Sequence, residues 1–172
     1  MIKQKFYPNS KLLAPFLKKK RMALGLCVHR DITPETMFSI EMARTIENPL
    51  LSIRLEKGDA MIARSRSIMA SKFLADGLED ILLFVDDDIA FNPQDVIKIF
   101  QDVQDGMDIV GGCYVTKSEI QPTLQQKIFK DQVIEISDKS KSVEVRYVST
   151  GFMAITRKVF ETMAKDMKRC MP

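Results

Sequence analysis

The chain has 172 residues, of which 45% are hydrophobic and 28% are charged, and its formal net charge is +3. This length and composition are those of a single globular domain with a substantial core. The apolar runs are far shorter than a membrane span, and the run that follows the basic residues 18–21 has no cleavage site. We therefore expect neither a transmembrane segment nor a signal peptide.

Positive charge is concentrated at the start of the chain, where residues 1–30 hold eight Lys and Arg and no Asp or Glu. We interpret residues 1–21 as a solvated basic arm and residues 22–172 as the folded domain. The arm lacks the aromatic interleaving of an RNA-binding module, so nucleic acid is not an expected partner. The three cysteines are widely spaced and match no metal pattern. They predict free thiols in a reducing compartment, and we expect a cytoplasmic protein.

The first part of the folded domain alternates between apolar runs and helical patterns. Strands are predicted at residues 22–28, 50–55, 81–85 and 108–113. Helices are predicted between them, from Pro34 after the cap Thr33, from the cap Asp59 to about Ala75 before Gly77, and from Pro93 after the cap Asn92 to about Gln104. We expect the first two helices to bury Met37, Ile40 and Ala43, and Ile62, Met69 and Phe73. The strand–helix order predicts an α/β fold whose mostly parallel sheet carries helices on both faces.

The chain changes character after Gly112. Residues 114–130 are predicted to form a loop, and the short alternating runs 133–136 and 143–148 are predicted to form a small hairpin. A last helix is predicted from Arg157 to Lys168.

Three consecutive acidic residues, Asp86, Asp87 and Asp88, directly follow the apolar run 81–85. Ligands bind at the carboxyl ends of strands in open α/β sheets, and adjacent carboxylates repel one another unless a cation or solvent neutralises them. Alternation along an extended segment lets Asp86 and Asp88 face one cation, with Asp87 turned aside. The oxygen ligands suit Mg²⁺ or Mn²⁺, which in turn suit phosphates. A polar turn before the next helix is the simpler alternative, and the cluster favours a metal or phosphate site over it.

Two families with acidic residues after a strand do not fit this position. Response regulators carry their acidic pair, and haloacid dehalogenase phosphatases their Asp-x-Asp, near the start of the domain. Here 85 residues precede the cluster.

Four segments, taken in order, carry a resemblance to a known family. They are residues 63–67 (ARSRS), 84–91 (FVDDDIAF), 108–114 (DIVGGCY) and 149–155 (STGFMAI) with 157–160 (RKVF). Residues 84–91 resemble the Asp-x-Asp segment of GT-A-fold glycosyltransferases, in particular the family-2-like and Anp1-like enzymes of microbes and viruses. The likeness covers roughly residues 22–168. It implies a GT-A, Rossmann-like three-layer sandwich with a small hairpin after the metal motif.

The resemblance implies roles for the acidic cluster and for the helix before it. Asp86 and Asp88 would hold Mn²⁺ or Mg²⁺ against the diphosphate of a nucleotide-sugar donor, and Asp86 and Asp87 would contact the nucleotide sugar. Arg66 would lie near the pyrophosphate, with Arg64 as the alternative in a different register. Surface helix residues are the competing interpretation of both arginines.

The resemblance also implies roles at two further places in the chain. His29 and Asp31, at the end of the first strand, would meet the nucleotide. Thr150, Gly151 and Phe152 would shape the sugar and acceptor pocket. A structural histidine and a plain turn into the last helix are the alternatives.

The chain departs from the family pattern in two ways. Ser65 or Ser67 stands where the family has Asn, and no downstream acidic segment supplies a catalytic base before Pro172. The expected function is metal-dependent transfer of a sugar from a nucleotide-diphosphate sugar to a glycan, lipid or protein acceptor, with a second copy of the chain as a candidate partner. A sugar-nucleotide-binding domain without efficient catalysis is the first alternative. A nucleotidyltransferase is the second, although residues 26–31 lack the glycine that would grip a triphosphate.

Overall fold

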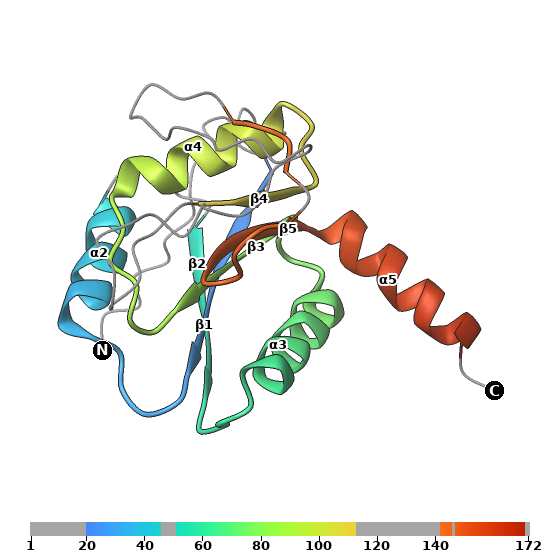
Figure 1. Cartoon of the computed structure of the whole chain (residues 1–172), viewed down its shortest axis with the longest axis horizontal. Helices are drawn as coiled ribbons and strands as arrows, with labels where there is room; N and C mark the ends of the chain where they lie inside the picture. Colours follow the sequence, from blue (N-terminus) through green and yellow to red (C-terminus); the bar gives the residue numbers. More distant parts are fainter. Residues whose placement is uncertain (1–19, 46–50, 113–141, 146, 171–172) are drawn as a thin grey trace, which may run out of the picture.

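The computed structural model describes residues 20–45, 51–112, 142–145 and 147–170 (Figure 1). The strands in these ranges are β1 (Met22–Val28), β2 (Leu51–Lys57), β3 (Ile81–Asp86), β4 (Ile109–Gly111) and β5 (Phe152–Thr156). The helices are α2 (Pro34–Thr45), α3 (Ile62–Asp76), α4 (Pro93–Gln104) and α5 (Arg157–Cys170). None of these helices has the length and apolar character needed to cross a membrane.

The five strands form one sheet in the order β2-β1-β3-β5-β4. Strands β1, β2 and β3 are parallel, whereas β5 runs antiparallel to both of its neighbours, β3 and β4. The expected α/β fold with a mostly parallel sheet is therefore confirmed. The order also places a topological switch point between β1 and β3, because the chain leaves β1 toward β2 and then returns past β1 to β3.

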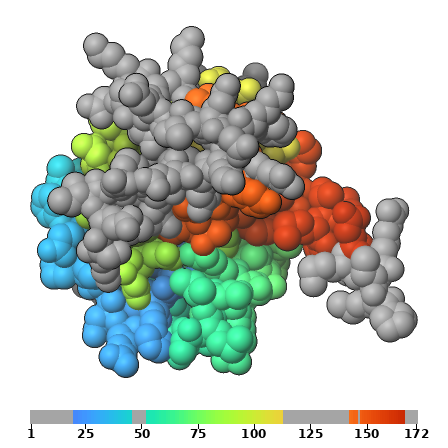
Figure 2. Space-filling model, viewed as in Figure 1, coloured from blue at the N-terminus to red at the C-terminus, as the bar shows by residue number. Residues whose placement is uncertain are grey.

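Helices cover both faces of the sheet and make three layers (Figure 1). One core lies beneath α2 and α4, and the other lies beneath α3 and α5. The alternation of strand side chains divides β1 between them: Leu24 and Leu26 enter the first core, and Ala23 and Cys27 enter the second. Strand β1 is buried along its whole length because it has neighbours on both edges and helices on both faces. Figure 2 shows α5 projecting from the rest of the molecule.

Gly25 lets α3 pack closely on β1. A Cβ atom at this position would lie 2.3 Å from Met69 Sδ and 3.0 Å from Leu82 Cδ1. Because Met69 is itself buried in the second core, it has little room to move away. The absence of a side chain at Gly25 therefore sets the distance between this helix and the sheet.

Most predicted helix boundaries are confirmed, and one predicted cap, Asp59, is wrong. Helix α4 has the predicted bounds, and Asn92 and Asp95 form a capping box at its start. Gly77 ends α3 in the left-handed conformation, at φ 64°. Asp59 is not the cap of α3, which begins at Ile62. Asp59 Oδ1 instead accepts a hydrogen bond from the Met61 amide at 2.9 Å, in the turn before the helix.

Two residues expected in the core are exposed. Met37 is 45% exposed and Ile62 is 46% exposed, so both predictions were wrong. Thr36 and Ser65 take their places in the buried stripes of α2 and α3. Both hydroxyl residues are small enough to fit beneath a helix, and Thr36 Oγ1 lies 2.8 Å from Thr33 Oγ1, which satisfies its polar group.

The main difference from the predicted topology is β5. The sequence predicted a pocket segment or a turn at residues 149–155, but Phe152–Thr156 is a strand between β3 and β4. No strand forms in residues 143–145 or 147–148, so the second strand of the predicted hairpin is wrong there. The first strand of that hairpin at 133–136, the loop at 114–130 and residues 1–19 of the predicted arm at 1–21 lie outside the described residues.

Candidate functional site

The carboxyl ends of β1 and β3 meet at one edge of the sheet, at the switch point. Cys27 lies opposite Asp86 in the parallel β1–β3 pair, and Val85 lies opposite Phe152 in the antiparallel β3–β5 pair. The residues that follow β1, the acidic cluster after β3 and the start of β5 therefore come together. Open α/β sheets bind ligands in the crevice at such a point.

Asp86 is held by the backbone of Gly151, just before β5, and by a cation from α3. Its amide donates to the carbonyl oxygen of Gly151 at 2.9 Å. Its carboxylate oxygen Oδ1 lies 2.6 Å from Arg66 Nη2, and the two side chains are 27% and 16% exposed. The Arg66 guanidinium carbon lies 5.7 Å from the centre of the Phe84 ring, close enough for a cation–π contact. Of the two arginines considered from the sequence, Arg66 is the one that contacts the cluster.

The surroundings of Asp86 disfavour the ionised form of its carboxylate. Burial raises the pKa of Asp86 above its ordinary value, Arg66 opposes this rise, and the charges of Asp88 and Asp87 add to it. The net direction is upward, so a single guanidinium does not fully offset the cost of holding this carboxylate ionised. A further cation at the cluster would stabilise the ionised form.

Asp87 is turned away from Arg66 and joins β3 to the loop after β1. Its Oδ2 accepts a hydrogen bond from the backbone amide of His29 at 3.1 Å, and its carbonyl oxygen accepts one from the Thr33 amide at 2.9 Å. Asp87 therefore ties the two strand ends together across the switch point. Asp88 is exposed on the turn that follows.

The other residues expected to contact the nucleotide are His29, Asp31 and Arg64, and they differ in their surroundings. The side chains of His29 and Asp31 are exposed after β1. Arg64 is 64% exposed and forms an ion pair with Asp59 at the end of β2, so it does not contact the acidic cluster. Asp59 has a lowered pKa because it accepts hydrogen bonds from Arg64 and from the Met61 amide.

The three residues expected to shape the sugar and acceptor pocket differ in their exposure and contacts. Thr150 is exposed, and Gly151 is buried with its carbonyl oxygen bonded to the Asp86 amide. Phe152 is only 3% exposed and packs against Phe91 with ring centroids 5.2 Å apart. Its side chain therefore contributes to the core, and its role in shaping a sugar or acceptor pocket stays a prediction.

Two neighbours of the cluster were not singled out from the sequence. Phe84 lies two positions before Asp86, and strand alternation, which places both side chains on one face, was the available signal. Cys27 is buried beside Asp86, and burial raises the pKa of its thiol to about 11. A single buried cysteine in an apolar strand gives no sequence signal that distinguishes it from other core residues.

The described residues offer a small set of metal ligands. No group of three or more His, Cys, Asp or Glu side chains within the described ranges is arranged to hold a metal ion. Mg²⁺ commonly takes only one or two protein carboxylates and completes its coordination with substrate phosphates and water. Asp86 and Asp88 fit that kind of site, and a bound phosphate would be part of it.

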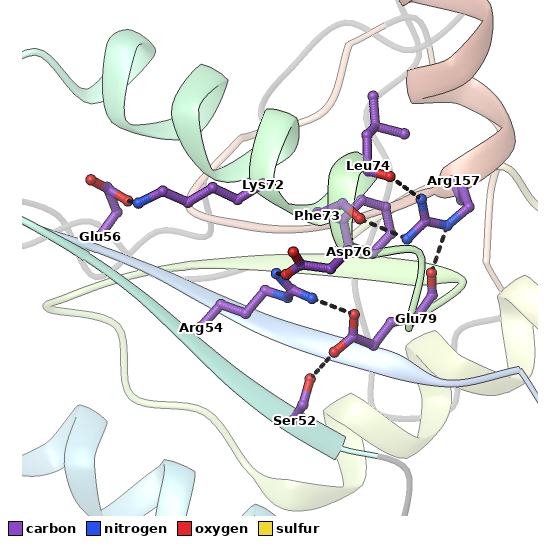
Figure 3. Close-up of polar contacts among 9 residues, drawn as sticks. All are labelled: Ser52, Arg54, Glu56, Lys72, Phe73, Leu74, Asp76, Glu79 and Arg157. Atoms are coloured by element: carbon purple, nitrogen blue, oxygen red, sulfur yellow. Dashed lines mark hydrogen bonds and ion pairs between the residues drawn. The ribbon is translucent and has the colours of Figure 1, made fainter.

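A second polar cluster lies near the amino end of β3 (Figure 3). Arg54 donates to Asp76 Oδ2 and to Glu79 Oε2, at 2.6 Å each. Arg157 donates to the carbonyl oxygens of Phe73 at 2.7 Å, Leu74 at 3.2 Å and Glu79 at 2.8 Å. Two of these carbonyls belong to the last turn of α3, where carbonyl oxygens have no hydrogen-bond donor within the helix. Arg157, part of the last resembling segment, therefore serves the fold and lies at the opposite edge from Asp86.

Comparison with known proteins identifies a structural neighbour and no sequence family. No family model matches the chain, and no curated protein matches it. The chain is similar to the crystal structure of A197 from STIV, with a TM-score of 0.60 and 22% sequence identity. The match covers 82% of this chain and 67% of that one. At this identity the likeness concerns the fold, and it agrees with the α/β architecture described above.

Proposed function

We propose that the chain is a metal-dependent glycosyltransferase of the GT-A type, which binds a nucleotide-diphosphate sugar at the carboxyl edge of its sheet. One observation carries the proposal. The acidic cluster lies at the switch point between β1 and β3, and its partly buried Asp86 carboxylate is already bonded to the Arg66 guanidinium. Such a place suits a diphosphate held jointly by a divalent cation and a guanidinium.

The residues present fit a Mn²⁺ or Mg²⁺ ion bound together with its substrate. Asp86 and Asp88 would hold the ion, and when bound it would offset the negative charge that the diphosphate gains as the sugar departs. Arg66 would contact phosphate oxygens, for which its planar fork of donors is suited. Asp87 keeps the strand ends in register through the His29 amide. His29 and Asp31 lie exposed beside the cluster and are available to the nucleotide.

Binding is tested by thermal denaturation in the presence of a panel of nucleoside diphosphates and nucleotide sugars, with and without Mn²⁺. A ligand that binds only the folded state raises the melting temperature. We expect a rise that requires both Mn²⁺ and a particular nucleoside diphosphate. A cooperatively melting protein that responds to none of them would refute the proposal.

A nucleotide-sugar-binding domain without efficient transfer is the second candidate. Two carboxylates at this edge are already engaged within the fold, Asp87 with the His29 amide and Asp59 with Arg64. Neither is placed as a general base for an acceptor hydroxyl, which must lie within hydrogen-bond reach. Release of nucleoside diphosphate from the nucleotide sugar separates the candidates, because a transferase hydrolyses its donor slowly without acceptor and a pure binder does not.

A further inference from the structure

The carboxylate best placed to bind a divalent cation is already bonded to a cation from the protein. Arg66 Nη2 lies 2.6 Å from Asp86 Oδ1, and the Arg66 side chain is 84% buried, since only 16% of it is exposed. The partners come from different elements, α3 and the end of β3. A metal ion on the same carboxylate would therefore meet a positive charge that the fold holds in place.

Arg66 is only partly satisfied in this arrangement. Its Nε is buried and has no hydrogen-bond partner within the part of the chain that the structure describes. The Phe84 ring supports the guanidinium with its centre 5.7 Å away, a contact that holds the group without using its donors. A buried, unused N–H is costly, and the oxygens of a phosphate are strong acceptors for it.

We propose that Arg66 acts as an internal counter-cation, which occupies Asp86 in the absence of substrate and transfers to the diphosphate when metal and nucleotide bind together. This inference rests on the function proposed above. The diphosphate accepts the guanidinium, and Asp86 is thereby released to the divalent ion. Arg66 is thus a positioning residue that makes metal binding depend on the nucleotide.

The exchange has a defined thermodynamic consequence. Metal alone binds weakly because it competes with Arg66 for Asp86, and nucleoside diphosphate alone binds weakly because it meets three carboxylates. Each ligand removes the obstacle to the other, so the two bind cooperatively. The coupling is reciprocal, and metal strengthens nucleotide binding by the same factor by which nucleotide strengthens metal binding.

The test measures binding of Mn²⁺ alone, by counting free Mn²⁺ with electron paramagnetic resonance. Arg66→Gln removes the competing charge, and we expect it to bind Mn²⁺ about tenfold more tightly than the wild type. Arg66→Lys keeps the charge and should stay close to the wild type. Arg64→Gln, two positions away on the same helix and paired with Asp59, is the matched control and should leave Mn²⁺ affinity unchanged.

A second measurement follows nucleotide binding by equilibrium dialysis of radiolabelled UDP, GDP and ADP. In the wild type Mn²⁺ should strengthen the binding of at least one of them, and in Arg66→Gln this gain should shrink. Arg66→Met, which keeps an apolar contact with Phe84, replaces Arg66→Gln if that variant melts early.

The outcomes separate the inference from the function on which it rests. Equal Mn²⁺ affinity in the wild type and a folded Arg66→Gln would overturn the inference, even if the wild type binds nucleotide with Mn²⁺. Loss of nucleotide binding in Arg66→Gln without a gain for Mn²⁺ would also overturn it, because Arg66 would then be a simple phosphate contact. A wild type that binds no nucleotide with Mn²⁺ would refute both.

Discussion

Replacing Arg157 with alanine should destabilise the fold strongly and leave the candidate site intact. The guanidinium donates three hydrogen bonds to backbone carbonyls and lies with its carbon 4.2 Å from the centre of the Phe73 ring. Hydrogen bonds from a charged donor contribute about 1.5–3 kcal/mol each, and a cation–π contact adds about 1 kcal/mol. These contributions overlap and water can reach part of a helix end, so we expect a loss of about 3–5 kcal/mol in the free energy of unfolding.

The measurement is urea unfolding at equilibrium, followed by far-ultraviolet circular dichroism because the chain has no tryptophan. Lys158→Ala is the matched control. It removes the neighbouring cation, which is 77% exposed and forms an ion pair with the Asp108 carboxylate at 2.8 Å. An exposed ion pair of this kind contributes about 0–1 kcal/mol.

Two results would refute the reasoning. A loss below about 1 kcal/mol for Arg157→Ala, similar to Lys158→Ala, would show that the carbonyls at the end of α3 do not depend on this side chain. A folded Arg157→Ala protein that loses Mn²⁺-dependent nucleotide binding would place Arg157 in the site. Arg157 follows the end of β5 that pairs with the start of β3 and lies opposite Asp80, which is about 20 Å along the strand from Asp86, so we expect no such effect.

Three further perturbations test other parts of the structure. Asp88→Ala should abolish Mn²⁺-dependent nucleotide binding. The melting temperature of the protein alone should stay near that of the wild type because Asp88 is exposed. Unchanged Mn²⁺-dependent affinity for the nucleotide would remove Asp88 from the site. Gly25→Ala should cost about 1–3 kcal/mol in urea unfolding, since its Cβ would lie 2.3 Å from Met69 Sδ, and a neutral effect would show that α3 can move away from β1. With Cys113 and Cys170 replaced by serine, Cys27 should react with a thiol reagent at pH 8 only as fast as the protein unfolds, because burial raises its pKa to about 11. The stability that Cys27 contributes should be complete below pH 9 and fall as the pH rises toward 11, relative to Cys27→Ala, and rapid labelling of the native protein would contradict the buried thiol.

Local patterns predicted most of the fold as far as β4. The strand at Met22–Val28 and the helix at Pro93–Gln104 have the bounds expected from apolar runs, caps and prolines. These signals act between residues close in the sequence, so they can be read without the tertiary structure. Exposed Met37 and Ile62 show the limit of this reading, because helical spacing alone does not say where the partner layer ends.

Part of the candidate site was also readable from the sequence. Three aspartates after an apolar run identified the cluster, and the resemblance pointed to both Arg64 and Arg66. The choice between them required the placement of α3 against β3, which bonds Arg66 to Asp86 and leaves Arg64 with Asp59. A helical step of two residues turns side chains to nearly opposite sides, so a small change in helix rotation would have reversed the assignment.

The sequence by itself determined where strands and helices of the first half begin and end, and where acidic side chains gather. The tertiary structure decided that Phe152–Thr156 enters the sheet antiparallel between β3 and β4. It also decided that Arg157 holds the end of α3, and that Gly151 meets Asp86. Phe152 and Asp86 are 66 positions apart in the chain. Side chains and caps close in the sequence determine the local backbone conformation. The pairing of strands that lie so far apart in the sequence depends instead on the burial of whole strands in a shared core.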